Sequence, residues 1–168
     1  EIISPDLTTN DPNKQNQEDS GGLSMDNSGA ENHTTIFTIA ESPLDENTIW
    51  VGTDDGNIQV TTDGGKTWTN TISNVEGVPD NTWVYHIEAS SHDSKTAYAV
   101  FDGHTSGDMT PYAYKTTDLG ETWTNIIPSN DVYGFVRNIQ EDYVNPDLLF
   151  LGTEFGLYIS VNGGKNWG

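Results

Sequence analysis

Three acidic residues occupy the same position in three repeated stretches of this sequence. Asp54, Asp102 and Glu154 each follow an aromatic residue by four positions. Glycoside hydrolysis needs a pair of carboxyl groups about 5 to 9.5 Å apart, one protonated and one ionised, so these acids are candidate catalytic residues. Each also stands one or two positions before a glycine, as in a hairpin turn, and a catalytic residue has no reason to recur in every repeat. Both interpretations of the three acids stay open.

Five further residues have side chains suited to holding a ligand. Trp83 could stack on a sugar ring, or it packs between sheets. His104 lies in an insertion, residues 101–111, that could contact a ligand, and its imidazole could act as a general base. Arg137 is the only arginine and could hold a carboxylate through two hydrogen bonds. The candidate ligand-binding residues are Trp83, His86, His104, Arg137 and Asp55.

A repeated turn must position these residues. It reads TTDGGKTW at 61–68, TTDLGETW at 116–123 and SVNGGKNW at 160–167. The Asp or Asn side chain can accept hydrogen bonds from nearby backbone amides, the glycine two positions later accepts a positive φ, and the tryptophan anchors the hairpin on apolar surface. The third copy lacks the Asp and the Thr, so we expect it to be the weakest hairpin. The predicted structural residues are Asp63, Gly65, Thr67, Trp68, Asp118, Gly120, Thr122, Trp123, Asn162, Gly164 and Trp167.

The repeat extends upstream of the turns. An isoleucine precedes an aromatic residue by eleven positions in each unit, in the pairs Ile39 and Trp50, Ile87 and Tyr98, and Ile139 and Phe150. Each unit contains short stretches rich in β-branched and aromatic residues, bounded by Gly, Asp, Asn or Pro, which predict four strands. Tandem four-stranded antiparallel sheets are the blades of a β-propeller. We therefore predict an all-β fold, a propeller segment of three four-stranded blades.

The predicted blades occupy residues 33–81, 82–132 and 133–168, and the third lacks its outer strand. Residues 1–32 are predicted to be the outer strand of a preceding blade followed by a long inter-blade loop, although composition alone also fits a linker without a role. Propellers usually have about four to eight blades, so three do not close a ring. We expect the remaining blades to come from a longer chain, or from a second copy of this one.

Composition excludes several classes of function. The formal net charge is −20 and there is no cysteine. This charge disfavours nucleic acid as a partner, and the sequence has no stretch apolar enough to predict membrane insertion. No metal-ligand spacing appears, so no metal site and no cofactor are predicted; the surplus of acids leaves calcium as an alternative. The acidity favours a secreted or cell-envelope protein, with any signal peptide outside this sequence.

The repeated turn resembles the Asp-box, or BNR repeat, of β-propellers. The runs IFTIAESP at 36–43, WVGTDDG at 50–56 and FLGTEFGLY at 150–158 resemble bacterial sortilin-like, glycosyl-hydrolase-like propellers related to xyloglucanases. This resemblance implies an exported protein that binds a glycan or a polypeptide through its loop face. The alternative is a β-glucan or xyloglucan hydrolase that uses paired carboxylates. Sialidases of this fold hold their substrate with three arginines, so a chain with one arginine argues against that activity.

Overall fold

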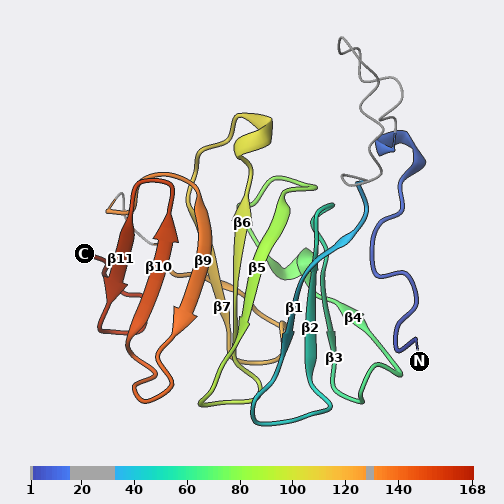
Figure 1. Ribbon diagram of the computed structural model, residues 1–168, viewed down its shortest axis with the longest axis horizontal. Coiled ribbons are helices and arrows are strands. Elements are labelled where there is room, and N and C mark those ends of the chain that lie inside the picture. The colour runs from blue at the N-terminus through green and yellow to red at the C-terminus, as the bar shows by residue number, and fades with distance from the viewer. Residues whose placement is uncertain (1, 16–32, 128–130) are drawn as a thin grey trace.

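The computed structural model describes residues 2–15, 33–127 and 131–168, which form three antiparallel sheets side by side (Figure 1). Blade one has strand order β1-β2-β3-β4, blade two has β5-β6-β7-β8, and blade three has β9-β10-β11. The strands are β1 (Ile36–Glu41), β2 (Ile49–Thr53), β3 (Ile58–Thr61), β4 (Thr69–Asn70), β5 (Trp83–Ala89), β6 (Ala97–Asp102), β7 (Tyr112–Thr116), β8 (Thr124–Asn125), β9 (Val136–Glu141), β10 (Leu149–Thr153) and β11 (Leu157–Ser160). The helical segments among the described residues are the short 3-10 turns η1 (Pro12–Lys14), η3 (Ile72–Asn74) and η4 (His104–Ser106).

The strand register confirms the sequence repeat. Each repeat isoleucine on the first strand of a blade pairs with the same position on the second strand, as Ile39 with Val51, Ile87 with Ala99, and Ile139 with Leu151. At the other side of blade three, Gly168 exchanges two backbone hydrogen bonds with Ile159. This register matches that of Thr69 on Val60 and of Thr124 on Lys115.

The hydrophobic core consists of two layers, one between each pair of adjacent blades. Trp50, Ile87 and Phe101 are buried in the layer between blades one and two, and Tyr98 and Ile139 in the layer between blades two and three. The two outermost sheet faces expose apolar side chains instead. Ile39 on β1 is 67% exposed and Leu157 on β11 is 64% exposed, with Ile159 and Val161 beside Leu157 in sequence also exposed. The three sheets therefore form an open segment of a ring, as predicted.

Each Asp-box turn contacts the chain of the blade before it. The indole of Trp123 donates to the Thr71 hydroxyl at 3.3 Å, and the indole of Trp167 donates to the Ile126 carbonyl at 2.7 Å. In blade one the corresponding indole, of Trp68, lies 3.4 Å from the Ile3 carbonyl. Residues 2–7 thus occupy the position relative to blade one that the residues after β4 occupy relative to blade two. The 16–32 part of the predicted inter-blade loop lies outside the described residues.

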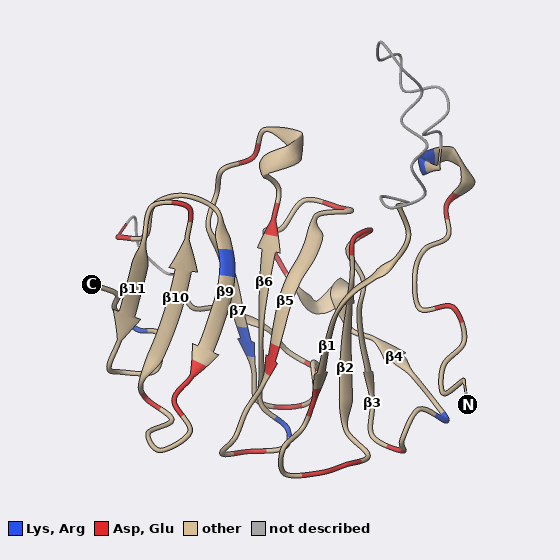
Figure 2. Cartoon of the chain, in the orientation of Figure 1, with Lys and Arg blue, Asp and Glu red and all other residues tan. Residues whose placement is uncertain are grey.

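The two edges of the blades carry different sets of turns. The Asp-box turns and the turns after β1, β5 and β9 lie at one edge, which is the lower edge in Figure 1. The opposite edge carries segments 54–57, 71–82, 103–111, 126–127, 131–135 and 154–156, and we call it the loop face. Every candidate catalytic acid follows or ends a strand that runs toward this face. Figure 2 shows acidic residues in the turns of both edges and few basic residues.

Candidate functional site

Three of the predicted site residues meet where blade two adjoins blade three. Asp102 ends β6, and its side chain is fully buried. One carboxylate oxygen lies 3.0 Å from the Arg137 guanidinium on β9. The His104 ring nitrogen Nδ1 lies 2.8 and 2.9 Å from the two oxygens of the same carboxylate, and the His104 backbone amide donates to it at 2.9 Å. The buried Asp102 carboxylate therefore holds the side chains of His104 and Arg137 in place.

Aromatic rings hold this cluster from the sides. The Arg137 guanidinium carbon lies 4.3 Å from the centre of the Tyr85 ring and 4.7 Å from that of the Phe135 ring. The His104 ring stacks on Phe135 with centroids 4.6 Å apart. Guanidinium groups are attracted to the faces of aromatic rings. These contacts restrain the one arginine of the chain, about one third of whose side chain remains exposed.

The two acids of the turn after β2 are occupied by structural hydrogen bonds. Asp54 accepts from the backbone amides of Thr34 and Thr35 at 2.9 and 2.7 Å, and from the Thr35 hydroxyl at 3.0 Å. Asp55 accepts from the Thr9 amide and hydroxyl, both at 2.6 Å, and from the Thr53 hydroxyl. Both carboxylates are buried. Their contacts tie residues 9 and 34–35 to blade one, so both act as local anchors.

Glu154 has a different environment from Asp54 and Asp102, although it occupies the equivalent repeat position. It is exposed, and its carboxylate forms no hydrogen bond or ion pair with any described residue. The neighbouring Phe155 is 72% exposed, and its ring lies against Gly134. The three repeat acids thus have three different roles: Asp54 in a backbone anchor, Asp102 in a buried ion pair, and Glu154 in a solvated turn.

Trp83 and His86 both lie on β5. The Trp83 ring contacts Phe37 on β1 with centroids 5.5 Å apart, so it packs partly between blades. His86 Nε2 is buried without a hydrogen bond and lies 3.9 Å from a carboxylate oxygen of Glu88. Burial lowers the pKa of His86. Trp83 lies directly opposite Asp102 in the β5–β6 ladder, whereas His86 has no hydrogen bond or ion pair with Asp102, His104 or Arg137 among the described residues.

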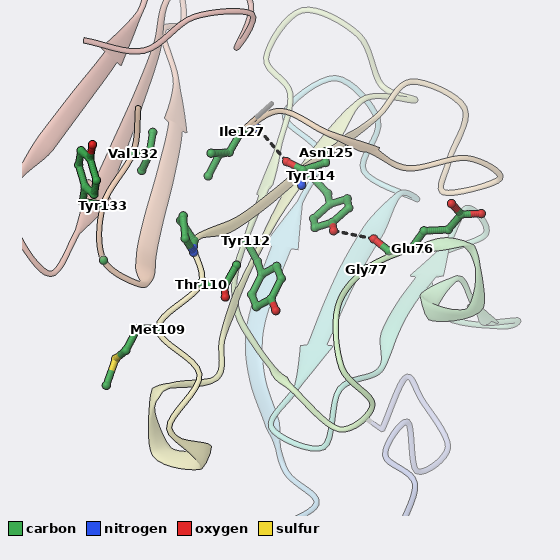
Figure 3. Close-up of a pocket in the computed structure, with 12 residues that line it drawn as sticks. Glu76, Gly77, Met109, Thr110, Tyr112, Tyr114, Asn125, Ile127, Val132 and Tyr133 are labelled. Atoms are coloured by element: carbon green, nitrogen blue, oxygen red, sulfur yellow. Dashed lines mark hydrogen bonds between the residues drawn. The ribbon is translucent and has the colours of Figure 1, made fainter. Parts of the chain in front are cut away.

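Beside the cluster, the loop face contains a pocket of about 740 Å³ between the outer part of blade two and the segment that leads into blade three. Figure 3 shows two tyrosine rings, Tyr112 and Tyr114, between Glu76 and Gly77 on one side and Val132 and Tyr133 on the other. The Tyr114 hydroxyl donates to the Glu76 carbonyl at 2.6 Å, and the Tyr112 hydroxyl donates to the Asp108 carboxylate at 2.7 Å. The remaining lining residues are Met109, Thr110, Pro111, Asn125, Ile127 and Gly134.

Sequence reasoning missed several residues of this region. Tyr85 and Phe135 hold Arg137, but nothing in the sequence marks them except that Phe135 immediately precedes the first strand of its blade. It also missed a carboxyl pair at the opposite edge. Burial and the charge of Glu141 raise the pKa of Glu88 to about 7. Glu141 itself is buried and accepts from Ser90, Ser91 and Tyr98 across the interface between blades two and three.

Within residues 2–15, 33–127 and 131–168, no three His, Cys, Asp or Glu side chains are grouped so that they could hold a metal ion. The same described residues include no helix with the length and apolar character needed to cross a bilayer.

Consecutive antiparallel sheets, each closed by an Asp-box turn, make this chain a segment of a β-propeller. Residues 59–70 match the family model of the BNR/Asp-box repeat, which confirms the resemblance seen in the turn sequence. No curated protein sequence matches the chain.

Solved propeller structures align with most of this chain. An ancestral GH74 enzyme aligns over 80% of this chain and 18% of its own, with TM-score 0.62 and 21% identity. YCF48 bound to D1 peptide aligns over 79% of this chain and 40% of its own, with TM-score 0.58 and 21% identity. The GH74 xyloglucanase from Xanthomonas campestris aligns over 80% of this chain and 23% of its own, with TM-score 0.59 and 12% identity. The chain thus spans between 18% and 40% of these three proteins, and at these identities the likeness shows the fold.

Proposed function

We propose that this propeller segment is a binding module that recognises a glycan or a polypeptide through its loop face, without chemistry of its own. The occupation of the acids supports this proposal most directly. The carboxylate oxygens of Asp54, Asp55 and Asp102 form internal hydrogen bonds and one ion pair. Only Glu154 of the candidate acids is left open to solvent, and a glycosidase needs two carboxyl groups facing one substrate.

The exposed apolar side chains of the loop face also favour recognition. Met109, Tyr133 and Phe155 are 52%, 63% and 72% exposed, and the first two line the pocket. Exposed aromatic residues beside a pocket are a common feature of binding sites. The proteins with similar folds include one bound to a peptide and one named as a xyloglucanase, so both ligand classes belong in the test. The acidity of the chain remains the basis for proposing an exported, envelope-associated location.

The hydrolase alternative rests on the GH74 likeness and on Glu154, which would need a second carboxylate from outside this chain. A direct test incubates the protein with xyloglucan oligosaccharides and with peptides of different charge, and measures binding by calorimetry and new reducing ends in parallel. We expect binding without turnover, weakened by Tyr133→Ala and by Phe155→Ala while the circular dichroism spectrum is unchanged. Release of reducing ends that Glu154→Gln abolishes would contradict the binding-only proposal.

A further inference from the structure

The segments that connect the strands at the loop face carry an excess of negative charge. Segments 54–57, 71–82, 103–111, 126–127, 131–135 and 154–156 contain seven acidic residues and no lysine or arginine. Arg137 lies nearby on β9, but its guanidinium is paired with Asp102. Lys14 belongs to η1, in the segment that Thr9 connects to Asp55 of this face, and Asp11 precedes it in the same segment. Lys66 and Lys165 belong to Asp-box turns at the opposite edge. The face therefore has a negative potential, which attracts a cationic partner and repels an anionic one.

The hydrogen-bonding groups of the pocket also suit a cation. A tyrosine hydroxyl has one hydrogen to donate, and Tyr112 and Tyr114 donate theirs to Asp108 and to the Glu76 carbonyl. The tyrosine oxygens can therefore only accept hydrogen bonds from a ligand. Of the described residues that line this pocket only Glu76 is charged, and its carboxylate forms no hydrogen bond with any described residue. A ligand rich in donors, such as one bearing ammonium or guanidinium groups, matches this surface.

Apolar side chains flank the same pocket. Met109 and Tyr133 are exposed, and Val132 and Ile127 contribute apolar wall (Figure 3). The side chains of lysine and arginine combine a charged end with an aliphatic stem, and the stem packs readily on such surface. The volume of about 740 Å³ lies in the range of ordinary ligand sites.

A second pocket occupies the corresponding place one blade earlier. It has a volume of about 400 Å³ and is lined by the turn after β2, by the connection from blade one to blade two, and by Thr9. Its charged lining residues are Asp55 and Asp80, and Asp80 is exposed. Ile72, Val75 and Val78 line it as well. The combination of acid and apolar wall thus recurs from blade to blade, as a site for an extended ligand would require.

We propose that the loop face binds an extended basic polypeptide, whose lysine or arginine side chains enter the pocket beside Glu76 and the pocket beside Asp80. This assignment rests on the proposed binding function and names its ligand class. The aliphatic stems lie on Met109 and Tyr133, and the cationic ends lie near the two carboxylates. Charge complementarity sets the sign of the partner, and the repeated pockets select an extended chain over a compact ligand.

The test measures fluorescence anisotropy of labelled hexalysine with the protein at about 50 mM salt, where surface electrostatics are weakly screened. We expect hexalysine to bind and hexaglutamate not to bind. Glu76→Gln and Asp80→Asn should each weaken hexalysine binding about 2- to 5-fold, the size of an exposed ion pair. Glu46→Gln is the matched control, because Glu46 is an exposed acid in the turn between β1 and β2 at the opposite edge.

Two further variants separate this site from diffuse charge attraction. Tyr133→Ala should weaken hexalysine binding without any change of charge. An equal effect of Glu46→Gln and Glu76→Gln would overturn the proposal, as would tighter binding of a chitosan hexamer than of hexalysine. If neutral glycans or peptides bind and Glu76→Gln does not change their affinity, the assignment of a basic ligand is overturned, but the proposed binding function stands. Absence of binding to every ligand tested would overturn both.

Discussion

The Asp102 carboxylate at the end of β6 lies 3.0 Å from the guanidinium of Arg137 on β9, so a buried ion pair joins blade two to blade three. His104 binds the same carboxylate from within blade two. This arrangement makes a residue that the repeat pattern marked as a catalytic candidate into part of the interface between blades. Its contribution to stability can be measured directly.

Replacement of Arg137 should destabilise the fold. Arg137→Met leaves the buried Asp102 carboxylate with His104 and one backbone amide as partners, and loss of one member of a buried pair costs about 3 kcal/mol. Urea unfolding followed by circular dichroism measures the change. The double variant Asp102→Leu with Arg137→Met removes both charges and should recover part of the loss. An Arg137→Met protein as stable as the parent would show that the ion pair contributes nothing.

The stability of the protein should fall as pH rises from about 4.5 to about 7. Glu88 has its pKa raised to about 7 from 4.5 by burial and by the nearby Glu141 carboxylate, while Gln140 donates to it and His86 lies 3.9 Å away. Between those pH values the folded state holds the proton more often than the unfolded state, so each rise in pH favours unfolding. We expect Glu88→Gln to flatten this part of the pH profile and to stabilise the protein at pH 8.

Urea denaturation at several pH values compares the parent with Glu88→Gln. The lowered pKa of His86 has the opposite effect, because a buried neutral histidine costs stability as pH falls below 6.5. The variant therefore isolates the Glu88 contribution as the difference between two profiles. Parallel profiles of the two proteins would contradict this role for Glu88.

The third Asp-box hairpin should gain stability when it is given the sequence of the first. Asp63 accepts from the Thr67 amide at 2.9 Å and from the Thr67 hydroxyl at 2.7 Å. Asn162 keeps the amide bond, at 3.0 Å from Asn166, but the hydroxyl bond has no counterpart. The double variant Asn162→Asp with Asn166→Thr should add about 1 kcal/mol of stability. Thermal unfolding measures the gain, and Asn166→Ser with Asn162 unchanged separates the hydroxyl from the carboxylate.

The stability gained by this double variant should depend on pH. Hydrogen bonds from Thr67 and Thr61 lower the pKa of Asp63 to about 2. A carboxyl whose pKa is lowered by folding stabilises the protein above the unfolded value of about 3.8, and the benefit disappears as pH falls toward 2. The double variant and its parent should therefore unfold at closer temperatures at pH 2.5 than at pH 7. An equal difference at both pH values would contradict a charged acceptor in the turn.

Alanine at the glycine two positions after the Asp of an Asp-box should be far more costly than alanine in an open loop. Gly120 has a φ of +84°, and an added Cβ would lie 2.7 Å from the Thr71 methyl of the preceding blade. Gly107 has nearly the same φ, +81°, but an added Cβ would meet no atom within 4 Å. Gly107→Ala should cost about 1 kcal/mol from backbone strain. Gly120→Ala should cost about 1 to 3 kcal/mol more, because the clash adds to the strain. Equal losses of unfolding free energy for the two variants in chemical denaturation would contradict close packing of this turn on the preceding blade.

The fold and the turns were predictable from the sequence because their hydrogen bonds are local. Asp63 and Asp118 bind residues two and four positions away, so the spacing of residue types in one short stretch contains the whole interaction. The strand pattern and the isoleucine-aromatic spacing recur with the same register in each blade. The equivalence of Asp54, Asp102 and Glu154 was correct as a position in the repeat.

Their chemistry depended on the tertiary structure. Equivalent backbone positions face different neighbours, because each blade packs against a different partner and carries a different loop. Asp54 accepts hydrogen bonds from Thr34 and Thr35, and Asp102 forms an ion pair with Arg137 of the next blade. The Glu154 carboxylate forms no hydrogen bond or ion pair with any described residue. The sequence by itself therefore determined the blades and the turns that close them, through contacts within a few residues. Packing between blades decided which carboxylates are buried and which face solvent, because burial and pairing depend on residues that are far apart along the chain.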